Sequence, residues 1–153
     1  MNLQNREEQL RYGKKDLKRG TMKKNLDVLV IDDNLEQASI TKLLIEQNGF
    51  AAQFTTSSQD ALKRIQENRP RLVILDLMMP DIDGLRLCKM IKEDPKTSHT
   101  RIIIYSGKMY EADRRKALAL GADLFLTKPT RSYILVDAIK NLLLTIPDEV
   151  HKN

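Results

Sequence analysis

The sequence is poor in the residue types that mark secreted, membrane-spanning and low-complexity proteins. Its 153 residues include one cysteine, no tryptophan, six glycines and five prolines. The lone Cys88 cannot form an internal disulfide bond, which is typical of a protein in the reducing cytoplasm. No apolar run approaches the roughly 20 residues of a membrane-spanning helix, and the charged N-terminus is unlike a signal peptide. We therefore expect a cytoplasmic protein that inserts no segment into a membrane.

Charge is distributed unevenly along the chain. The net charge is +5, and residues 1–24, with eight basic and three acidic residues, hold the whole excess. A basic segment can attract nucleic acid or acidic lipid without specificity, but a solvated tail is the simpler interpretation, so nucleic-acid binding is not favoured. We predict a flexible basic extension at 1–24, one globular domain at 25–147 and a C-terminal tail at 148–153.

Short apolar runs alternate with helical patterns after the extension. Most of the runs are rich in Val, Leu and Ile and apolar rather than alternating, which indicates strands buried on both faces; the run at 51–55 is the weakest candidate. Strands are expected at 26–31, 51–55, 72–75, 102–105 and 123–126, and helices at 34–47, 58–68 (capped by Ser57 or Ser58), 84–93, 111–120 and 132–145. Five βα units with short connections predict an α/β fold, a doubly wound parallel sheet with five helices on its two faces.

The first predicted helix, 34–47, has Ile40, Leu43 and Leu44 at helical spacing. Gly49 stands where a C-terminal cap is expected, because glycine adopts the left-handed conformation that ends many helices.

Polar residues end four of the apolar runs. Asp32 and Asp33 follow the first run, Asp76 the third, and Ser106 and Lys128 the fourth and fifth. Parallel sheets bind ligands at the carboxyl ends of their strands, so these side chains should meet. Three carboxylates together would repel each other without a cation, and oxygen ligands suit Mg²⁺. With Asp76 as nucleophile, Lys128 for a phosphate oxygen and Ser106 as hydroxyl donor, the set predicts phosphoryl transfer onto a carboxylate.

Each of these residues also has a purely structural interpretation. Asp33 could cap the helix that follows it, and Asp76 could be a turn residue at a strand end. Ser106 and Lys128 each begin an ordinary turn pair. The occurrence of the whole set at strand ends, in this order, favours the phosphoryl-transfer site.

Four segments carry a resemblance to a known family. They are VLVIDDN (28–34), LVILDLMMPDIDG (72–84), IIIYSG (102–107) and GADLFLTKP (121–129). Over roughly 26–146, the sequence resembles the receiver domain of bacterial two-component response regulators. The resemblance implies a flavodoxin-like sheet with strand order 2-1-3-4-5.

The resemblance also implies a phosphoacceptor switch rather than an enzyme with a separate substrate. The phosphoryl group would come from a histidine kinase or phosphotransfer protein and would be accepted by Asp76. The chain would catalyse only its own Mg²⁺-dependent phosphorylation and dephosphorylation. Asp33 and Asp76 would bind Mg²⁺ directly together with the Met78 backbone carbonyl, and Asp32 would act through water.

Further family positions concern how the signal leaves the domain. Ser106 matches the switch hydroxyl, Lys128 the phosphate-binding lysine, and Phe125 the aromatic rotamer switch. The resemblance implies output to a downstream protein, whose identity stays open, through the last two helices and the fifth strand. A phosphorylation-linked dimer is also left open. Little sequence follows the last predicted helix, so we expect a single-domain regulator, with an excised receiver fragment as the alternative.

Other functions fit less well. A phosphatase of the haloacid-dehalogenase type usually needs a second Asp two residues after its nucleophile, where this chain has Met78. No G-x-G-x-x-G motif of a dinucleotide enzyme occurs. An inactive receiver-fold scaffold remains an alternative, but the complete acidic set with Lys128 argues against it.

Overall fold

The computed structural model describes residues 26–108 and 110–144. The predicted extension at 1–24, residues 145–147 at the end of the predicted domain and the predicted tail at 148–153 lie outside the described residues. The division into these three parts therefore stays a prediction.

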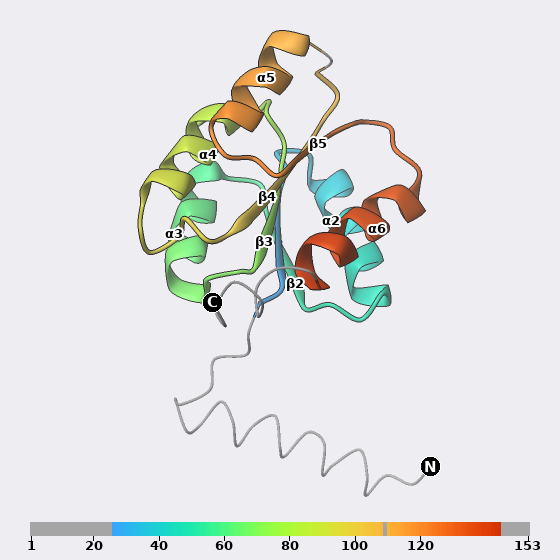
Figure 1. Ribbon diagram of the computed structural model, residues 1–153. Helices are drawn as coiled ribbons and strands as arrows, with labels where there is room; N and C mark the ends of the chain where they lie inside the picture. The colour runs from blue at the N-terminus through green and yellow to red at the C-terminus, as the bar shows by residue number, and fades with distance from the viewer. Residues whose placement is uncertain (1–25, 109, 145–153) are drawn as a thin grey trace, which may run out of the picture.

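Strands and helices alternate along the described chain, as the sequence predicted (Figure 1). The strands are β1 (Val28–Ile31), β2 (Ala52–Thr55), β3 (Leu72–Leu75), β4 (Arg101–Ser106) and β5 (Leu124–Thr127). The helices are α2 (Leu35–Gln47), α3 (Ser58–Asn68), α4 (Gly84–Glu93), α5 (Glu111–Ala119) and α6 (Ser132–Leu144). Within this part of the chain, no helix combines the length and the apolar character needed to cross a membrane.

All strands are parallel and lie in the order β2-β1-β3-β4-β5, which confirms the predicted topology. Helices α2 and α6 cover one face of the sheet, and α3, α4 and α5 cover the other (Figure 1). Ile31 of β1 pairs with Leu75 of β3. The next residues, Asp32 and Asp76, therefore leave the sheet at neighbouring points of one edge.

Two apolar cores flank the central strands. Along β1, Leu29 and Ile31 pack in the core beneath α3–α5, and Val28 and Val30 pack in the core beneath α2 and α6. Burial of each such side chain stabilises the fold by roughly 1.5–3 kcal/mol. Cys88 of α4 is fully buried in the first core, and desolvation raises the pKa of its thiol to about 11, so it stays protonated and packs as an apolar residue.

Polar side chains fix the helix ends near the sheet edge. The N-cap of α2 is Asn34, whose side-chain oxygen accepts the N–H of Gln37 at 3.0 Å. Asp33 precedes this cap, so the interpretation of Asp33 as the capping residue is wrong. Of the two candidate serines, Ser57 caps α3. Gly49 follows α2 with a φ of +91°, in agreement with its predicted place at the helix end.

The apolar residues that give α2 its helical spacing are mostly not the ones that it buries. Ile40 and Leu43 are 60% and 54% exposed, and Leu44 is half-buried, whereas Ala38 and Ile45 are buried against the sheet. The helical period was correct, but apolar residues surround much of this helix, so spacing alone did not identify the face that packs. The small side chain of Ala38 allows the helix to lie close to β1 and β2.

Candidate functional site

Three carboxylates meet at the carboxyl edge of the sheet. Asp32, Asp33 and Asp76 each offer an oxygen within 4.8 Å of the others. Asp32 and Asp76 are buried and Asp33 is exposed. The N–H of Asn34 donates to Asp32 Oδ1 at 2.9 Å, and the N–H of Met78 donates to Asp76 Oδ1 at 3.1 Å. These bonds orient the two buried carboxylates while leaving the cluster rich in negative charge.

Lys128, which follows β5, reaches across β4 to these acids. Its Nζ lies 2.6 Å from Asp32 Oδ2 and 3.4 Å from Asp76 Oδ2, and it also donates to Gln37 Oε1 at 2.9 Å. Burial alone would lower the pKa of the Lys128 ammonium. The hydrogen bond to Asp32 and the charges of Asp76 and Asp32 outweigh burial and raise that pKa, so the side chain stays charged.

Ser106 lies fully buried at the end of β4. Its hydroxyl accepts the backbone N–H of Lys108 at 3.2 Å, and its carbonyl accepts the backbone N–H of Lys128 at 2.9 Å. Phe125 is half-buried against the core beneath α3–α5 and pairs with Ile104, two residues before Ser106. Ser106 and Phe125 therefore stand on adjacent strands; their roles in switching stay predictions.

The loop after β3 carries Asp76 and Met78 and depends on a close approach of α4. The Met78 side chain is 61% exposed, and its backbone is tied to Asp76 through the N–H described above. Gly84 donates its N–H to Leu77 O at 3.0 Å, and a Cβ at Gly84 would lie 2.5 Å from Asp76 O. Sequence reasoning placed Gly84 at the start of a helix but did not foresee this close approach, because a backbone–backbone contact leaves no pattern of residue types.

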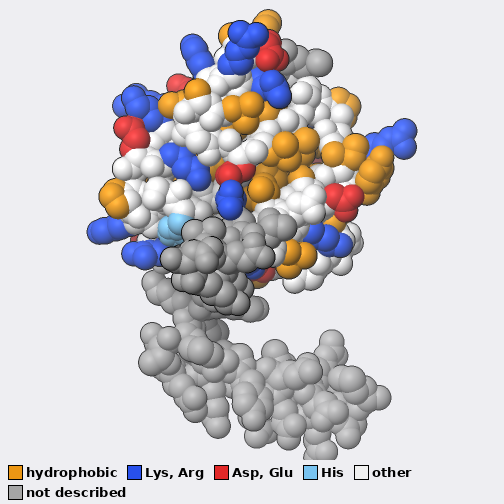
Figure 2. Space-filling view, in the orientation of Figure 1, with side chains coloured by type: hydrophobic (Ala, Val, Ile, Leu, Met, Phe, Trp, Pro, Cys, Tyr) orange, Lys and Arg blue, Asp and Glu red, His pale blue; other side chains and the backbone are white. Residues whose placement is uncertain are grey.

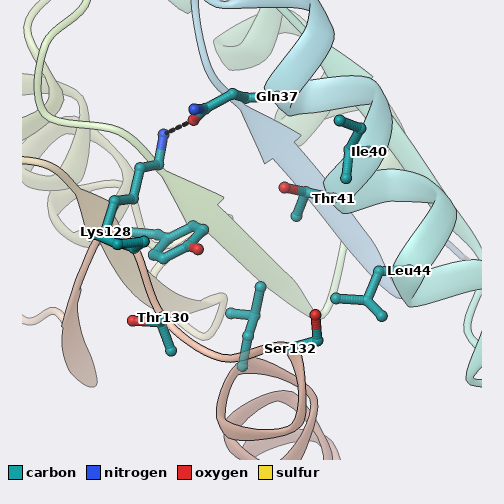
Figure 3. A pocket seen from close by; sticks show the side chains of 10 residues that line it. Gln37, Ile40, Thr41, Leu44, Lys128, Thr130 and Ser132 are labelled. Atoms are coloured by element: carbon teal, nitrogen blue, oxygen red, sulfur yellow. Dashed lines mark hydrogen bonds between the residues drawn. The ribbon is translucent and has the colours of Figure 1, made fainter.

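A groove of about 280 Å³ opens beside the acids, between α2 and the chain that follows β5 (Figure 3). Its lining includes Gln37, Ile40, Thr41 and Leu44 from α2, and Lys128, Thr130 and Ser132 from the segment after β5. The ring of Tyr105 also lines it, with Lys128 Nζ 5.2 Å from the ring centroid. Sequence reasoning missed Gln37 and Tyr105, because no motif connects either residue to Lys128.

A doubly wound sheet of order 2-1-3-4-5, with clustered aspartates and a lysine at its carboxyl edge, defines the receiver class of signalling domains. The family model described as the response regulator receiver domain matches residues 28–140, and the chain belongs to this family. Its fold is typical of phosphoacceptor switches in two-component signal transduction.

Curated relatives include regulators about twice as long as the matched region and shorter proteins. The uncharacterized transcriptional regulatory protein YclJ of Bacillus subtilis is 33% identical over 118 residues, which cover 77% of this chain and 51% of YclJ. The chain thus spans about half the length of that relative. Protein PilG of Pseudomonas aeruginosa is 33% identical over 115 residues, covering 75% of this chain and 85% of PilG.

Solved structures show the same fold. A putative response regulator from Chloroflexus aurantiacus superposes with a TM-score of 0.74 at 29% identity, covering 79% of this chain and 99% of that one. The signal receiver domain of a signal transduction histidine kinase from Syntrophus aciditrophicus also gives a TM-score of 0.74 at 29% identity, covering 80% and 92% of the two chains.

Proposed function

We propose that this receiver domain accepts a phosphoryl group on Asp76 from the phosphohistidine of a histidine kinase or phosphotransfer protein. The observation that carries the proposal is the position of the Asp76 carboxylate, at a strand end, beside two further carboxylates and 3.4 Å from the Lys128 ammonium. Membership of the receiver family removes support for a haloacid-dehalogenase-type phosphatase. Action as a single-domain regulator is part of this proposal; the match covers 85% of PilG but only 51% of YclJ.

The transfer is a substitution at phosphorus. One carboxylate oxygen of Asp76 forms the new O–P bond while the P–N bond to the donor imidazole breaks, and the electron pair of that bond stays on the nitrogen. The Met78 N–H restrains the Asp76 carboxylate. Lys128 supplies positive charge for a phosphoryl oxygen, and the Ser106 hydroxyl supplies a hydrogen-bond donor.

The chemistry of the acidic cluster fits Mg²⁺. Carboxylate and carbonyl oxygens are hard ligands, and the Lys128 ammonium leaves the three carboxylates with a net negative charge. Asp33, Asp76 and the Met78 carbonyl would hold the ion, with Asp32 acting through water. Bound Mg²⁺ would offset the carboxylate charge and stabilise charge on the transferring phosphoryl oxygens.

Output would use the surface of α5, β5 and α6, on which Ser106 and Phe125 would act. Exposed apolar side chains occur there, with Leu118 of α5 at 37% exposure and Tyr133 and Ile134 of α6 at 61% and 39%. Figure 2 shows apolar side chains gathered toward the α6 side of the molecule. Such a surface suits a downstream protein or a second receiver, with formation of the contact coupled to movement of Ser106 and Phe125.

Intact-mass measurement after incubation with acetyl phosphate tests the acceptor. We expect one phosphoryl adduct on the wild type with Mg²⁺, little without Mg²⁺, and none on the Asp76→Ala variant. Failure of the folded wild-type protein to form an adduct would instead support the inactive scaffold. An adduct that persists in Asp76→Ala would show that another residue accepts the phosphoryl group.

A further inference from the structure

The ammonium of Lys128 uses its full capacity for hydrogen bonds. Its three N–H groups have three acceptors: Asp32 Oδ2 at 2.6 Å, Gln37 Oε1 at 2.9 Å and Asp76 Oδ2 at 3.4 Å. The Tyr105 ring lies 5.2 Å from the same nitrogen. Lys128 is therefore held between the acidic cluster and the first turn of α2.

Gln37 differs from the other two acceptors in charge and position. It reaches from α2 across the mouth of the groove to Lys128 (Figure 3). Its backbone is fixed independently, because its N–H donates to the Asn34 side chain at 3.0 Å. Its amide is neutral, so binding of a cation at the carboxylates or attachment of a phosphoryl group to Asp76 leaves its capacity to accept from Lys128 unchanged.

Phosphorylation would require Lys128 to exchange acceptors. A cation at the aspartates competes with Lys128 for Asp32 and Asp76, and a phosphoryl oxygen becomes a new acceptor near Asp76. A lysine side chain has a long flexible stem, so an ammonium that lost both carboxylate contacts would sample many positions. A remaining hydrogen bond to Gln37 would reduce that freedom and keep the ammonium near Asp76.

We propose that Gln37 is a positioning residue: through its side-chain carbonyl it holds the Lys128 ammonium beside Asp76 while the carboxylate contacts are exchanged for a phosphoryl oxygen. Gln37 itself touches neither the phosphoryl group nor the cation. The inference rests on the proposed function of Asp76 as acceptor, and it concerns the rate at which Asp76 is phosphorylated.

The test compares Gln37→Met with Gln47→Met. Both variants replace an exposed glutamine of α2 by an apolar side chain of similar length. Gln47 is the last residue of α2, at the opposite end of the helix from Gln37. Phosphorylation by acetyl phosphate is followed by intact mass over a range of Mg²⁺ and donor concentrations. Gln37→Glu serves as a second variant, because it keeps an acceptor oxygen for Lys128. Urea unfolding establishes that every variant is folded.

We expect Gln37→Met to lower the rate at saturating Mg²⁺ and donor about five- to tenfold, as loss of a typical hydrogen bond would. The half-saturating Mg²⁺ and donor concentrations should stay within twofold of wild type. Gln47→Met should keep the wild-type rate, and Gln37→Glu should retain at least half of it.

Three results would overturn the inference: an unchanged saturating rate in Gln37→Met, an equal loss in Gln47→Met or Gln37→Glu, or a change confined to the half-saturating Mg²⁺ concentration. Absence of an adduct on wild type would be a different failure, because it would refute the proposed function itself.

Discussion

Acidic residues at the two ends of the sheet differ in their hydrogen-bond and ion-pair partners. At the amino end, Asp123 accepts the N–H of Ile102 at 2.8 Å and pairs with Arg101 at 2.8 Å. Asp27 likewise accepts the N–H of Ala51 at 2.8 Å and lies 3.4 Å from an Arg71 nitrogen. Each of these acids therefore has a backbone donor and a cationic partner of its own.

At the carboxyl end, Asp32, Asp33 and Asp76 lie within 4.8 Å of one another, and Lys128 forms ion pairs with two of them. Negative charge exceeds positive charge within this cluster. The acids at the amino end join strands, whereas those at the carboxyl end form a cluster whose charge Lys128 only partly offsets. The partners of an aspartate, rather than its place beside a strand, distinguish the two roles.

The largest effect on stability is expected at the amino end. Asp123→Ala would leave the Ile102 N–H without its acceptor and Arg101 without its partner, which costs about 2–4 kcal/mol of unfolding free energy. Urea unfolding measures this loss, while phosphorylation should stay within twofold of wild type. Glu111→Ala, which removes only exposed ion pairs, should cost less than about 1 kcal/mol. Loss of the phosphoryl adduct in folded Asp123→Ala would contradict the purely structural role given to this acid.

Gly84→Ala tests whether packing also matters at the carboxyl end. The new Cβ would lie 2.5 Å from Asp76 O and 2.6 Å from Leu77 Cα, so the backbone must shift at a cost of about 1–3 kcal/mol. Phosphorylation of Asp76 should slow as well, because the loop that carries it moves. Gly107→Ala is the control, since its Cβ meets nothing within 4 Å, and its stability should change by less than about 0.5 kcal/mol. Equal stability losses in the two variants would contradict this account.

Asp33→Asn removes one charge from the acidic cluster. Without Mg²⁺ it should raise stability by up to about 1 kcal/mol, because it relieves repulsion among carboxylates close to solvent. Added Mg²⁺ should raise the thermal midpoint of the wild type and have little effect on the variant, because a ligand stabilises only the state that binds it. Differential scanning fluorimetry with and without Mg²⁺ measures both effects. A Mg²⁺-induced rise of the thermal midpoint that persists in Asp33→Asn would show that Asp33 is not a ligand of the ion.

The smallest expected effect on stability concerns Asp81, an acidic residue of the loop after β3. It adds a third kind of acid to the comparison, one whose partners are mainly backbone N–H groups. Desolvation opposes ionisation of Asp81, but backbone N–H groups, first that of Gln59, lower the pKa of its carboxyl below the ordinary value of 3.8. Its contribution to stability is therefore present above pH 3.8 and is lost as pH falls below that value. Asp81→Asn should flatten the stability profile between pH 5 and about 2 by less than 1 kcal/mol, since solvent screens the exposed group. A stability profile as steep in Asp81→Asn as in wild type would show that Asp81 does not contribute to this pH dependence.

Strand and helix bounds were largely predictable, with informative differences at the amino end. Strand β3 and helix α4 have the bounds expected from their apolar patterns. The first and fifth predicted strands included Asp27 and Asp123, whereas β1 and β5 begin after these residues. Both carboxylates accept an N–H from a neighbouring part of the sheet. A local apolar pattern contains no information about such a cross-strand hydrogen bond.

The sequence by itself determined the order of the elements, the parallel sheet and the residues that end each strand. Those properties follow from apolar runs, helical spacing and the alternation of strands with helices, because a helix between successive strands returns the chain so that those strands run parallel. The tertiary structure decided which face of α2 packs, how closely Gly84 approaches Asp76, and that Gln37 meets Lys128 across 91 positions of sequence. These outcomes depend on how surfaces fit together in three dimensions, which periodicity and residue type do not specify.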